Sequence, residues 1–572
     1  MTSWQILSSL PEMTNQIEAM MRPPYEVMRL DRMGAAFQTR LSFMRVLVRR
    51  MARESWQFSQ TTFELDEKGL GHAVYTVDTG KRSYSLIAFS HDLDTDLRND
   101  RVIATAWDAT FNLFDGIPDT RDIERLEDNT PKQEAGRFTS GELVLARANR
   151  SERIFNHVVT ALAGGRQPAI ERLLDVGYLM RTTAVYGSGK FGCADRAKIA
   201  DRPEINGAFQ VEMLAVYLIR LFSIDLAEHI ALQSNDNACH LSLQNRRFIG
   251  IGNATGLGMA PFLINHQTLL HKWVYAKELA LARVRSIENL SPSTSRKFES
   301  EFKKAQQHIA AWQVEDEEQM LRIEVLRSDL TRLESEYADL LRRTQPYNAI
   351  FVWVDQHLGI EARELTISIL LECCPALVDE LSEQFLADSQ EEPWDPSMQV
   401  TELSELLDRH YPWAEGIDPG SPDESHRIWY YSEEKLEPRL GTRNNNPDIE
   451  SEMPLAITRD LAELRNILRQ ESCITTTLSL CARHPGLRHI VKRLQAAAKF
   501  PYGEVAGNLL SESFRPIDIL RFKLAYFGAS GFDPKSALWT RVTMYQGAPL
   551  PDELDPESAD SWAFPGAPVE TA

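Results

Sequence analysis

The sequence predicts a mainly α-helical protein with a small antiparallel β-sheet (α+β) near its N-terminus, within a multidomain helical architecture. Three observations predict this fold class. Long stretches carry apolar residues three and four apart, and one group of short β-rich segments is separated by turn residues. The chain has 572 residues, 43% of them hydrophobic and 25% charged, which suits a globular protein of two to four domains.

The N-terminal region, residues 1–145, is predicted to be an α+β domain. One long amphipathic helix is expected from Pro24 to Gln57, because apolar residues recur there with helical spacing. Strand-like segments follow at 75–77, 84–89 and 102–107, with turn formers such as Asp78, Thr79 and Gly80 between them, as in a small antiparallel sheet.

Residues 146–292 are predicted to form a helical domain with two glycine-rich loops. Helices are expected at 147–163, 168–179 and 204–232, and a further helix runs to about residue 288. The first glycine-rich segment spans 186–192 and the second spans 250–261. Such segments interrupt helical periodicity and let a backbone approach a ligand closely.

Residues 293–345 are predicted to form one long charged helix or a helical hairpin. A heptad seam covers barely ~2.5 heptads, which favours an intramolecular hairpin over an independent dimeric coiled coil. The seam residues are Ile323, Leu326, Leu330, Leu333, Tyr337 and Leu340.

The rest of the chain is predicted to be a C-terminal helical region, 346–548, followed by an extended tail, 549–572. Pro, Asp, Glu, Asn and Gly are dense near 388–453, which indicates a mobile acidic insertion with few core contacts. The final residues are rich in proline and acids, as in an extended arm.

The overall charge of -20 repels polyanions, which argues against nucleic acid or an anionic membrane as a partner of the whole surface. Six cysteines without a CxxC pair indicate neither a disulfide framework nor a structural zinc module. With no signal-peptide pattern and no long apolar window, the expectation is a cytoplasmic protein. No metal site is predicted, and the sequence identifies no cofactor.

The segment around the first glycine-rich loop holds the densest group of functional side chains. Arg181, Tyr186, Ser188 and Lys190 are the predicted ligand-binding residues, with Lys190 neutralising a bound anion. Cys193 is the best candidate nucleophile because nearby basic residues would lower a thiol pKa. The alternatives are a plain hairpin turn at 187–190 and an inert thiol.

The second glycine-rich segment is expected to open a helix whose free N–H groups favour a phosphate or carboxylate. Arg246 would clamp the anion, and Asn253 and Thr255 would hydrogen-bond it. His266, just inside that helix, joins the predicted ligand-binding residues, but its spacing of five from His271 does not suit a metal pair. A tight helix-packing turn is the alternative reading.

Asp225 and His229 lie one turn apart on the predicted helix 204–232. That spacing suits a carboxylate-oriented imidazole, so they are the predicted acid/base pair. The surrounding helix is strongly apolar, and a buried charged residue there needs a partner. A purely structural pair is the alternative.

Together these residues suggest an enzyme acting on a small anionic metabolite bound between the two loops, with the reaction class open. One rival is a non-enzymatic assembly protein that forms a homo-oligomer through the 293–345 helix. The other is a winged-helix nucleic-acid binder in residues 150–192, since residues 146–200 carry nine basic and four acidic side chains in helix–helix–hairpin order.

Overall fold

The computed structural model describes most of the chain, in the following segments: residues 17–29, 37–93, 106–130, 141–186, 199, 201–256, 267–383, 394–415, 429–432, 438–440, 452–455, 457–504, 525–534 and 539–568. Within these segments, no helix combines the length and the apolar character needed to cross a membrane.

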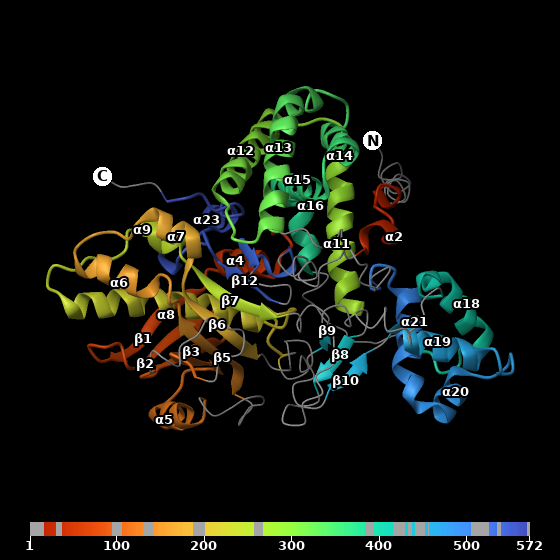
Figure 1. Ribbon diagram of the computed structural model, residues 1–572, viewed down its shortest axis with the longest axis horizontal. Coiled ribbons are helices and arrows are strands. Elements are labelled where there is room, and N and C mark those ends of the chain that lie inside the picture. The colour runs from red at the N-terminus through yellow and green to blue at the C-terminus, as the bar shows by residue number, and fades with distance from the viewer. Residues whose placement is uncertain are drawn as a thin grey trace. The chain divides into compact units, whose positions relative to one another are not determined.

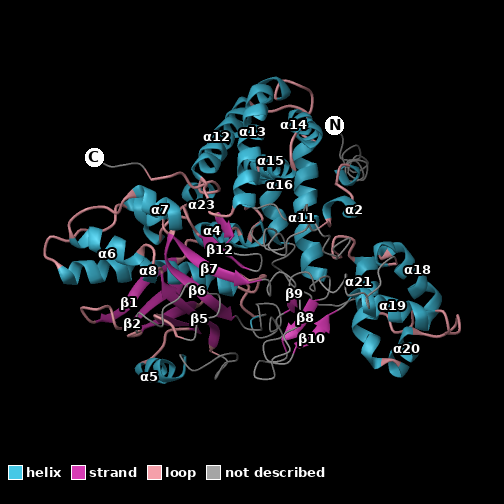
Figure 2. Cartoon of the chain, viewed as in Figure 1, coloured by secondary structure: helices cyan, strands magenta, loops and turns pink. Residues whose placement is uncertain are grey.

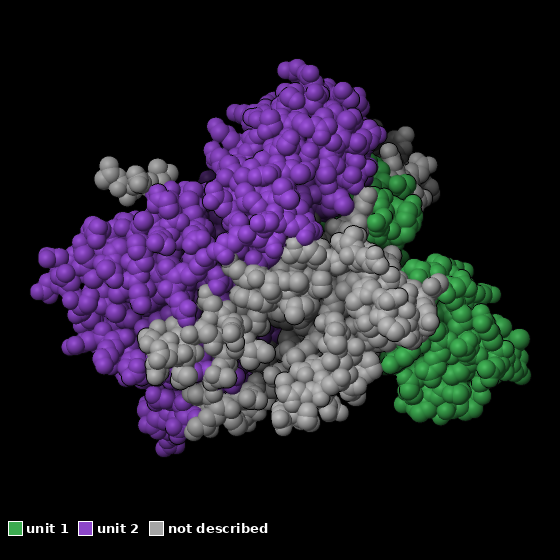
Figure 3. All heavy atoms as spheres, in the orientation of Figure 1, with its two compact units in different colours: residues 1–34, 257–282, 387–523 green, residues 35–256, 283–386, 524–572 purple. Residues whose placement is uncertain are grey.

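The chain divides into two units, each assembled from segments that are far apart in sequence (Figure 3). Unit 1 comprises residues 1–34, 257–282 and 387–523, and unit 2 comprises residues 35–256, 283–386 and 524–572. The sequence had suggested five consecutive regions. Local composition marks boundaries along a chain but does not reveal that a late segment returns to an early one.

Unit 2 is built on one nine-stranded sheet (Figures 1 and 2). In spatial order its strands are β1 (Gln57–Leu65), β2 (Gly71–Asp78), β3 (Ser83–Ser90), β4 (Ala109–Asp115), β5 (Glu142–Arg150), β6 (Tyr178–Tyr186), β7 (Gly250–Gly256), β12 (Trp539–Met544) and β11 (Gly531–Pro534). β6 and β7 pair in parallel, and the other neighbours in this sheet pair antiparallel.

The predicted fold class is therefore wrong: the sheet is large and mixed instead of small and antiparallel. β2 and β3 confirm the strands expected at 75–77 and 84–89, and residues 102–105 lie outside the described segments. β5 was mistaken for the start of a helix because its first eight residues are buried, and a strand buried on both faces lacks the alternation that marks an exposed one.

The helix expected from Pro24 to Gln57 is also wrong. The described residues contain two separate helices there, α2 (Pro24–Val27) and α4 (Phe43–Arg53). Ser42 is extended immediately before α4, and Ser55 adopts a positive φ of 54° shortly after it. The chain then enters β1 at Gln57, so the apolar spacing continued across residues that are not helical.

Two helices pack on opposite faces of the sheet. On one face, Phe222 of α8 (Gln210–Ser234) contacts Tyr75 of β2 and Phe111 of β4, with ring centroids 6.5 and 5.5 Å away. On the other face, α5 (Thr120–Asn129) buries Leu126. That face has a core of Val74, Ile87, Phe89 and Leu126. Adjacent strand residues point to opposite faces, so both faces are covered.

The remaining helices of unit 2 are α6 (Phe155–Ala163), α7 (Ile170–Val176), α9 (Leu243–Phe248), α12 (Pro292–Ala311), α13 (Glu317–Leu340), α14 (Pro346–His357), α15 (Ile360–Cys373), α16 (Pro375–Val378) and α23 (Pro556–Asp560). β6 follows α7 but pairs with β5 and β7 inside the sheet. The described residues 150–186 therefore do not have the order of a winged helix-turn-helix, whose second helix leads into a hairpin.

α12 and α13 form a helical hairpin. The ring of Tyr337 on α13 contacts those of Phe298 and Phe302 on α12, with centroids 5.7 and 5.3 Å apart. Ile323, Leu326, Leu330, Leu333 and Leu340 are all buried. The heptad seam thus packs within this chain.

The C-terminal residues pack onto unit 2 instead of extending from it as the sequence suggested. Trp562 is buried, and the guanidinium of Arg45 on α4 lies 5.1 Å from the centre of its ring. Arg40 Nη2 donates to Asp560 Oδ1 at 2.9 Å. These contacts tie the end of the chain to α4.

Unit 1 has its own core. Its described α-helices and strands are α2, most of α11 (Gln267–Arg285), α18 (Val400–His410), β8 (Trp429–Ser432), β9 (Pro438–Leu440), β10 (Glu452–Leu455), α19 (Ile457–Leu468), α20 (Thr477–Arg483) and α21 (Arg488–Lys499). Val400, Leu403 and Leu407 of α18 belong to the hydrophobic core that α19 and α21 complete. The stretch 388–453 therefore contributes core residues, contrary to the sequence expectation.

Candidate functional site

α8 connects the parallel strands β6 and β7 and so sets the geometry of the candidate site. Its apolar residues surround the helix almost completely, from Leu214 to Ile224, and most of its residues are buried, as expected of a core helix. A crossover helix runs antiparallel to the strands that it joins. The N-terminus of α8 therefore lies toward the ends of these strands, and its C-terminus toward their beginnings.

The β6–β7 pair has two edges. We call the end near Tyr186 and Gly256 the carboxyl edge, and the end near Tyr178 and Gly250 the amino edge. Thr182 pairs with Asn253, so the two strands finish at nearly the same level. In Figure 1, β7 points away from α9 toward the carboxyl edge. Each glycine-rich segment continues from that edge, into residues outside the described segments.

Midway along the β6–β7 pair, Thr182 and Asn253 lie side by side on one face of the sheet, and Arg181, the residue before Thr182, points to the other face. Asn253 Nδ2 donates to Thr182 Oγ1 at 2.8 Å, and that hydroxyl donates to Gly252 O at 3.1 Å. Arg181 is 1% exposed and pairs with Asn149 of β5 in the ladder. The other predicted residues on these strands are Tyr186, which ends β6, and Thr255, which pairs with Thr540.

A second buried arginine lies on the same sheet face as Arg181. Arg147 is two residues before Asn149 on β5, so both point to the same side of the sheet. It is buried and its guanidinium lies 4.1 Å from the centre of the Trp107 ring.

Two glycines of the second segment are explained by packing. A Cβ atom at Gly252 would lie 2.7 Å from the Tyr178 ring. At Gly250 it would collide with Met544 O on β12. The segment from 250 to 256 is therefore a strand squeezed between neighbours, and not the loop that the sequence suggested. Glycine is required at these two positions because of close approach.

Asp225 and Arg246 meet at the amino edge. Arg246 Nη2 lies 3.2 Å from Asp225 Oδ1, while Tyr75 OH and Gln60 Nε2 donate to Oδ2 at 2.8 and 3.3 Å. Burial raises the pKa of Asp225 above its usual value, and the hydrogen bond from Tyr75 and the charge of Arg246 oppose that rise. A partly buried carboxyl with a raised pKa is a possible proton donor or acceptor.

Glu228 extends the amino-edge cluster. Its Oε2 lies 2.8 Å from His240 Nδ1, and its Oε1 accepts the N–H of Leu241 at 3.0 Å and lies 3.6 Å from Arg246 Nε. One arginine thus lies between two carboxylates. Each of these charged groups has a partner inside unit 2.

His229 does not join that cluster. Its Nε2 lies 2.8 Å from the carbonyl oxygen of Asp66, and its ring meets Phe63 edge-on at 5.3 Å. Among the described contacts there is no hydrogen bond between His229 and Asp225. The two residues share a helix side, but each is oriented by a different neighbour.

Sequence reasoning missed Arg220, the strongest polar anchor of the amino edge. Its side chain is completely buried and donates to backbone carbonyls that flank β7 and β12: Ile249 O at 2.7 Å, Arg247 O at 2.9 Å, Ala548 O at 3.0 Å and Arg246 O at 3.3 Å. Burial lowers the pKa of this guanidinium to about 10. The available signal was a lone arginine inside an apolar helical run.

Arg220 also sets the position of α8 along the direction of β7. Because it reaches Ile249, directly before β7, Asp225 and His229 lie beyond the start of that strand. β7 has seven residues, which at ~3.3 Å per residue place the carboxyl edge roughly 20 Å away. Asn253 is the middle residue of β7 and Arg181 pairs with Gly252, so these two lie roughly 10 Å or less along the strands from the amino edge, whereas Thr255 lies next to the carboxyl edge.

Four predicted site residues lie outside the described segments: Ser188, Lys190, Cys193 and His266. In the described part of the chain, no three His, Cys, Asp or Glu side chains gather as they would around a metal ion.

Comparison with known proteins adds no relative. No family model, no curated protein and no solved structure matches this chain.

Proposed function

We propose that this protein is an enzyme that binds a small anionic metabolite at the carboxyl edge of β6 and β7. The observation that carries the proposal is the parallel pairing of these two strands. These strands end at nearly the same level, so Tyr186 and Gly256, the last described residues of the two glycine-rich segments, lie at the same edge of the sheet. In sheets with parallel strands, ligands commonly bind just outside the carboxyl ends.

The charges near this edge support an anionic ligand. Arg181 and Arg147 are buried on one face of β5 and β6, and Lys190 follows β6 by four residues. Asn253 and Thr182 supply neutral hydrogen-bonding groups on the adjoining strands. In a protein of net charge -20, the basic residue Lys190, four positions after β6, would attract an anion to this edge.

A catalytic role of Asp225 and His229 requires a ligand at the other edge. A general acid or base must lie within hydrogen-bond reach of the proton it transfers, directly or through one water. The amino edge is roughly 20 Å away along β7. Replacing Asp225 should therefore leave a ligand at the carboxyl edge bound as before.

The test is ligand-dependent thermal stabilisation of the full chain with inorganic phosphate, pyrophosphate, citrate and AMP as probes. A ligand at 100 times its Kd adds about 2.7 kcal/mol to the free energy of unfolding. We expect Lys190→Ala and Asn253→Ala to abolish the stabilisation by the probe that binds. Lys81→Ala, at an exposed turn, and Asp225→Asn should retain it. Turnover of that probe or a close analogue then distinguishes an enzyme from a binding protein.

Two outcomes would contradict this placement. If all the variants respond to every probe like the wild type, the anion does not bind at the carboxyl edge. If Asp225→Asn loses the response and Asn253→Ala keeps it, the site lies at the amino edge.

A further inference from the structure

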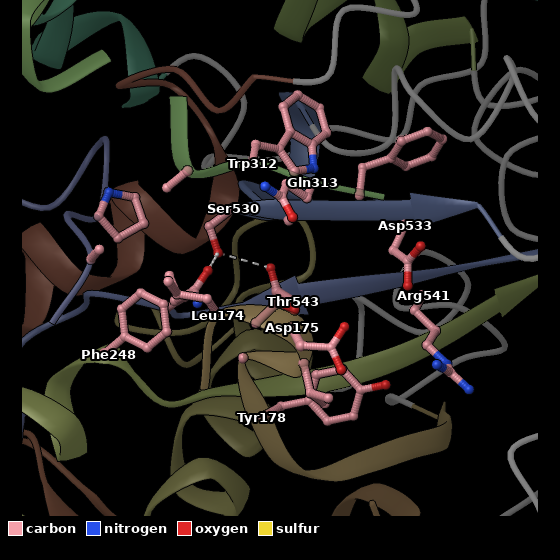
Figure 4. Close-up of a pocket in the computed structure, with 18 of the residues that line it drawn as sticks. Leu174, Asp175, Tyr178, Phe248, Trp312, Gln313, Ser530, Asp533, Arg541 and Thr543 are labelled. Carbon is pink, nitrogen blue, oxygen red and sulfur yellow. Dashed lines mark hydrogen bonds between the residues drawn. The ribbon is translucent and has the colours of Figure 1, made fainter. Parts of the chain in front are cut away.

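A cavity in unit 2 lies near the amino ends of β6 and β7, away from the carboxyl edge (Figure 4). Its volume is about 90 Å³, which is several times the space that one water needs. Residues from α7, β6, α12, β11, β12 and the C-terminal segment line it. None of the residues discussed at the carboxyl edge belongs to its lining.

Aromatic rings form much of the wall. They belong to Tyr178, Phe248, Trp312 and Phe532. In Figure 4, Trp312 lies on one side of the cavity and Phe248 and Tyr178 lie on the other. Phe37 meets Trp312 edge-on at 6.3 Å, and the Tyr178 ring rests against Gly252. Both rings are thus held in place, and such walls suit a flat apolar or aromatic body.

Hydrogen-bonding groups lie between these walls. Ser530 Oγ donates to Thr543 O at 3.1 Å and lies 3.3 Å from Gln546 Oε1. Gln546 is 8% exposed, and among the described residues no hydrogen bond uses its Nε2. Gly177 makes room beside that atom, since a Cβ there would lie 2.9 Å from it. The buried amide therefore keeps a donor for a ligand.

The charged residues that line the cavity, two positive and two negative, sum to no net charge. Arg153 and Arg541 carry positive charge, and Asp175 and Asp533 carry negative charge. Arg153 is 2.5 Å from Glu315 and 3.9 Å from Asp175. Burial lowers the pKa of His308 below its usual value, so its imidazole adds no charge at neutral pH. A lining without net charge favours a neutral ligand over an anion or a cation.

We propose that this cavity binds an uncharged, planar heteroaromatic ring with a hydrogen-bonding edge, the chemistry of a nucleobase. The rings of Trp312 and Tyr178 contact the faces of the ligand, and Gln546 and Gln313 pair with its edge. Aromatic side chains stack on any base, because every base has a π-face. The ring can arrive as a free base or as part of a nucleoside or nucleotide.

The test is calorimetric titration of the full chain with adenine, guanine, cytosine and uracil, and then with adenosine and AMP. At least one base should bind with a Kd below about 1 mM. If the nucleoside or AMP binds more tightly than the free base, the ring is part of a larger ligand. Weaker binding of both identifies the free base as the ligand.

Matched variants locate the binding. Trp312→Leu should weaken it at least tenfold, whereas Trp353→Leu, on α14 outside the cavity, should change it less than twofold. Gln546→Met keeps the side-chain volume and should also weaken binding about tenfold. If Trp312→Leu does not fold, Gln546→Met still tests the proposal. For Gln313→Ala, Gln307→Ala on the exposed side of α12 is the control.

Three results would overturn the proposal. The first is that no base binds at millimolar concentration. The second is that the cavity variants and their controls weaken binding equally. The third is that zwitterionic amino acids bind and the bases do not. The positively and negatively charged residues of the lining would then recognise an amino acid and not a base.

Discussion

The two edges of the β6–β7 pair are built from different chemistry. At the amino edge, ionised side chains are matched inside unit 2: Arg246 lies between Asp225 and Glu228, and Arg220 is surrounded by backbone carbonyls. From the middle of the pair toward the carboxyl edge, the described contacts are between neutral groups, Thr182 and Asn253, and the buried Arg181 lies on the opposite face. The difference suggests that the amino edge holds the sheet together and that the carboxyl edge is the better place for a ligand.

The strongest way to break this comparison is Arg220→Met. The change removes the guanidinium that donates to four backbone carbonyls, three directly before β7 and one after β12. Buried acceptors left unsatisfied are costly, so the free energy of unfolding should fall by about 3–5 kcal/mol. Urea denaturation measures it. Arg342→Met, at a side chain that is 77% exposed, should change stability by no more than ~0.5 kcal/mol. Equal effects would mean that Arg220 anchors nothing.

Gly250→Ala should have the next largest effect. The added methyl group would meet Met544 O and lie 2.8 Å from the Thr543 side chain, both on β12. Overpacking of this kind costs about 1–3 kcal/mol, measured by urea denaturation. Gly486→Ala is the matched control, since nothing lies within 4 Å of the added atom. A wild-type stability for Gly250→Ala would contradict the tight contact between β7 and β12.

Asp225→Asn tests the amino edge through its pH dependence. Burial raises the folded-state pKa of Asp225, so the folded chain keeps a proton there that the unfolded chain has lost. The wild type therefore loses stability relative to the variant as the pH rises from the unfolded pKa, about 3.9, through the folded one. The free energy of unfolding of the wild type minus that of the variant, measured by urea denaturation between about pH 3 and 7, should decrease as the pH rises. An advantage that grows with pH would show that the ion pair with Arg246 dominates.

Thr182→Val should have the smallest effect on stability, about 0.5–1.5 kcal/mol, because it removes one acceptor and one donor. Its value lies in the ligand response. If the carboxyl edge binds the anion, the thermal shift should shrink in Thr182→Val and recover in Thr182→Ser, which keeps the hydroxyl. An undiminished shift in Thr182→Val would remove this residue pair from the site.

The sequence predicted the elements whose signal is local. α8, β2, β3 and α13 have clear periodicity, and each is present. The large sheet was missed because β7 pairs with β12, whose residues come almost 300 positions later, and no local pattern carries that information. Burial on both faces also removed the alternation from β5.

The candidate site was predicted in part. The glycine-rich segments and Arg181 are predicted from their composition, and the structure pairs β6, which leads into the first segment, with β7, which forms the start of the second. Spacing on one helix could not show that Asp225 pairs with Arg246 while His229 turns to Asp66. Those partners come from the residue after β1 and from α9, which only the fold brings to α8.

The late position of β12 has a consequence for synthesis. β7 leaves the ribosome long before β12 does, since Trp539 comes 283 positions after Gly256. At a rate of synthesis of ~5–20 residues per second, one edge of β7 lacks its antiparallel partner for roughly 15–60 s. An unpaired strand edge is a template for pairing with other chains. During this period the nascent chains should be prone to pair with one another through β7, and a chaperone that covers this strand would prevent that aggregation.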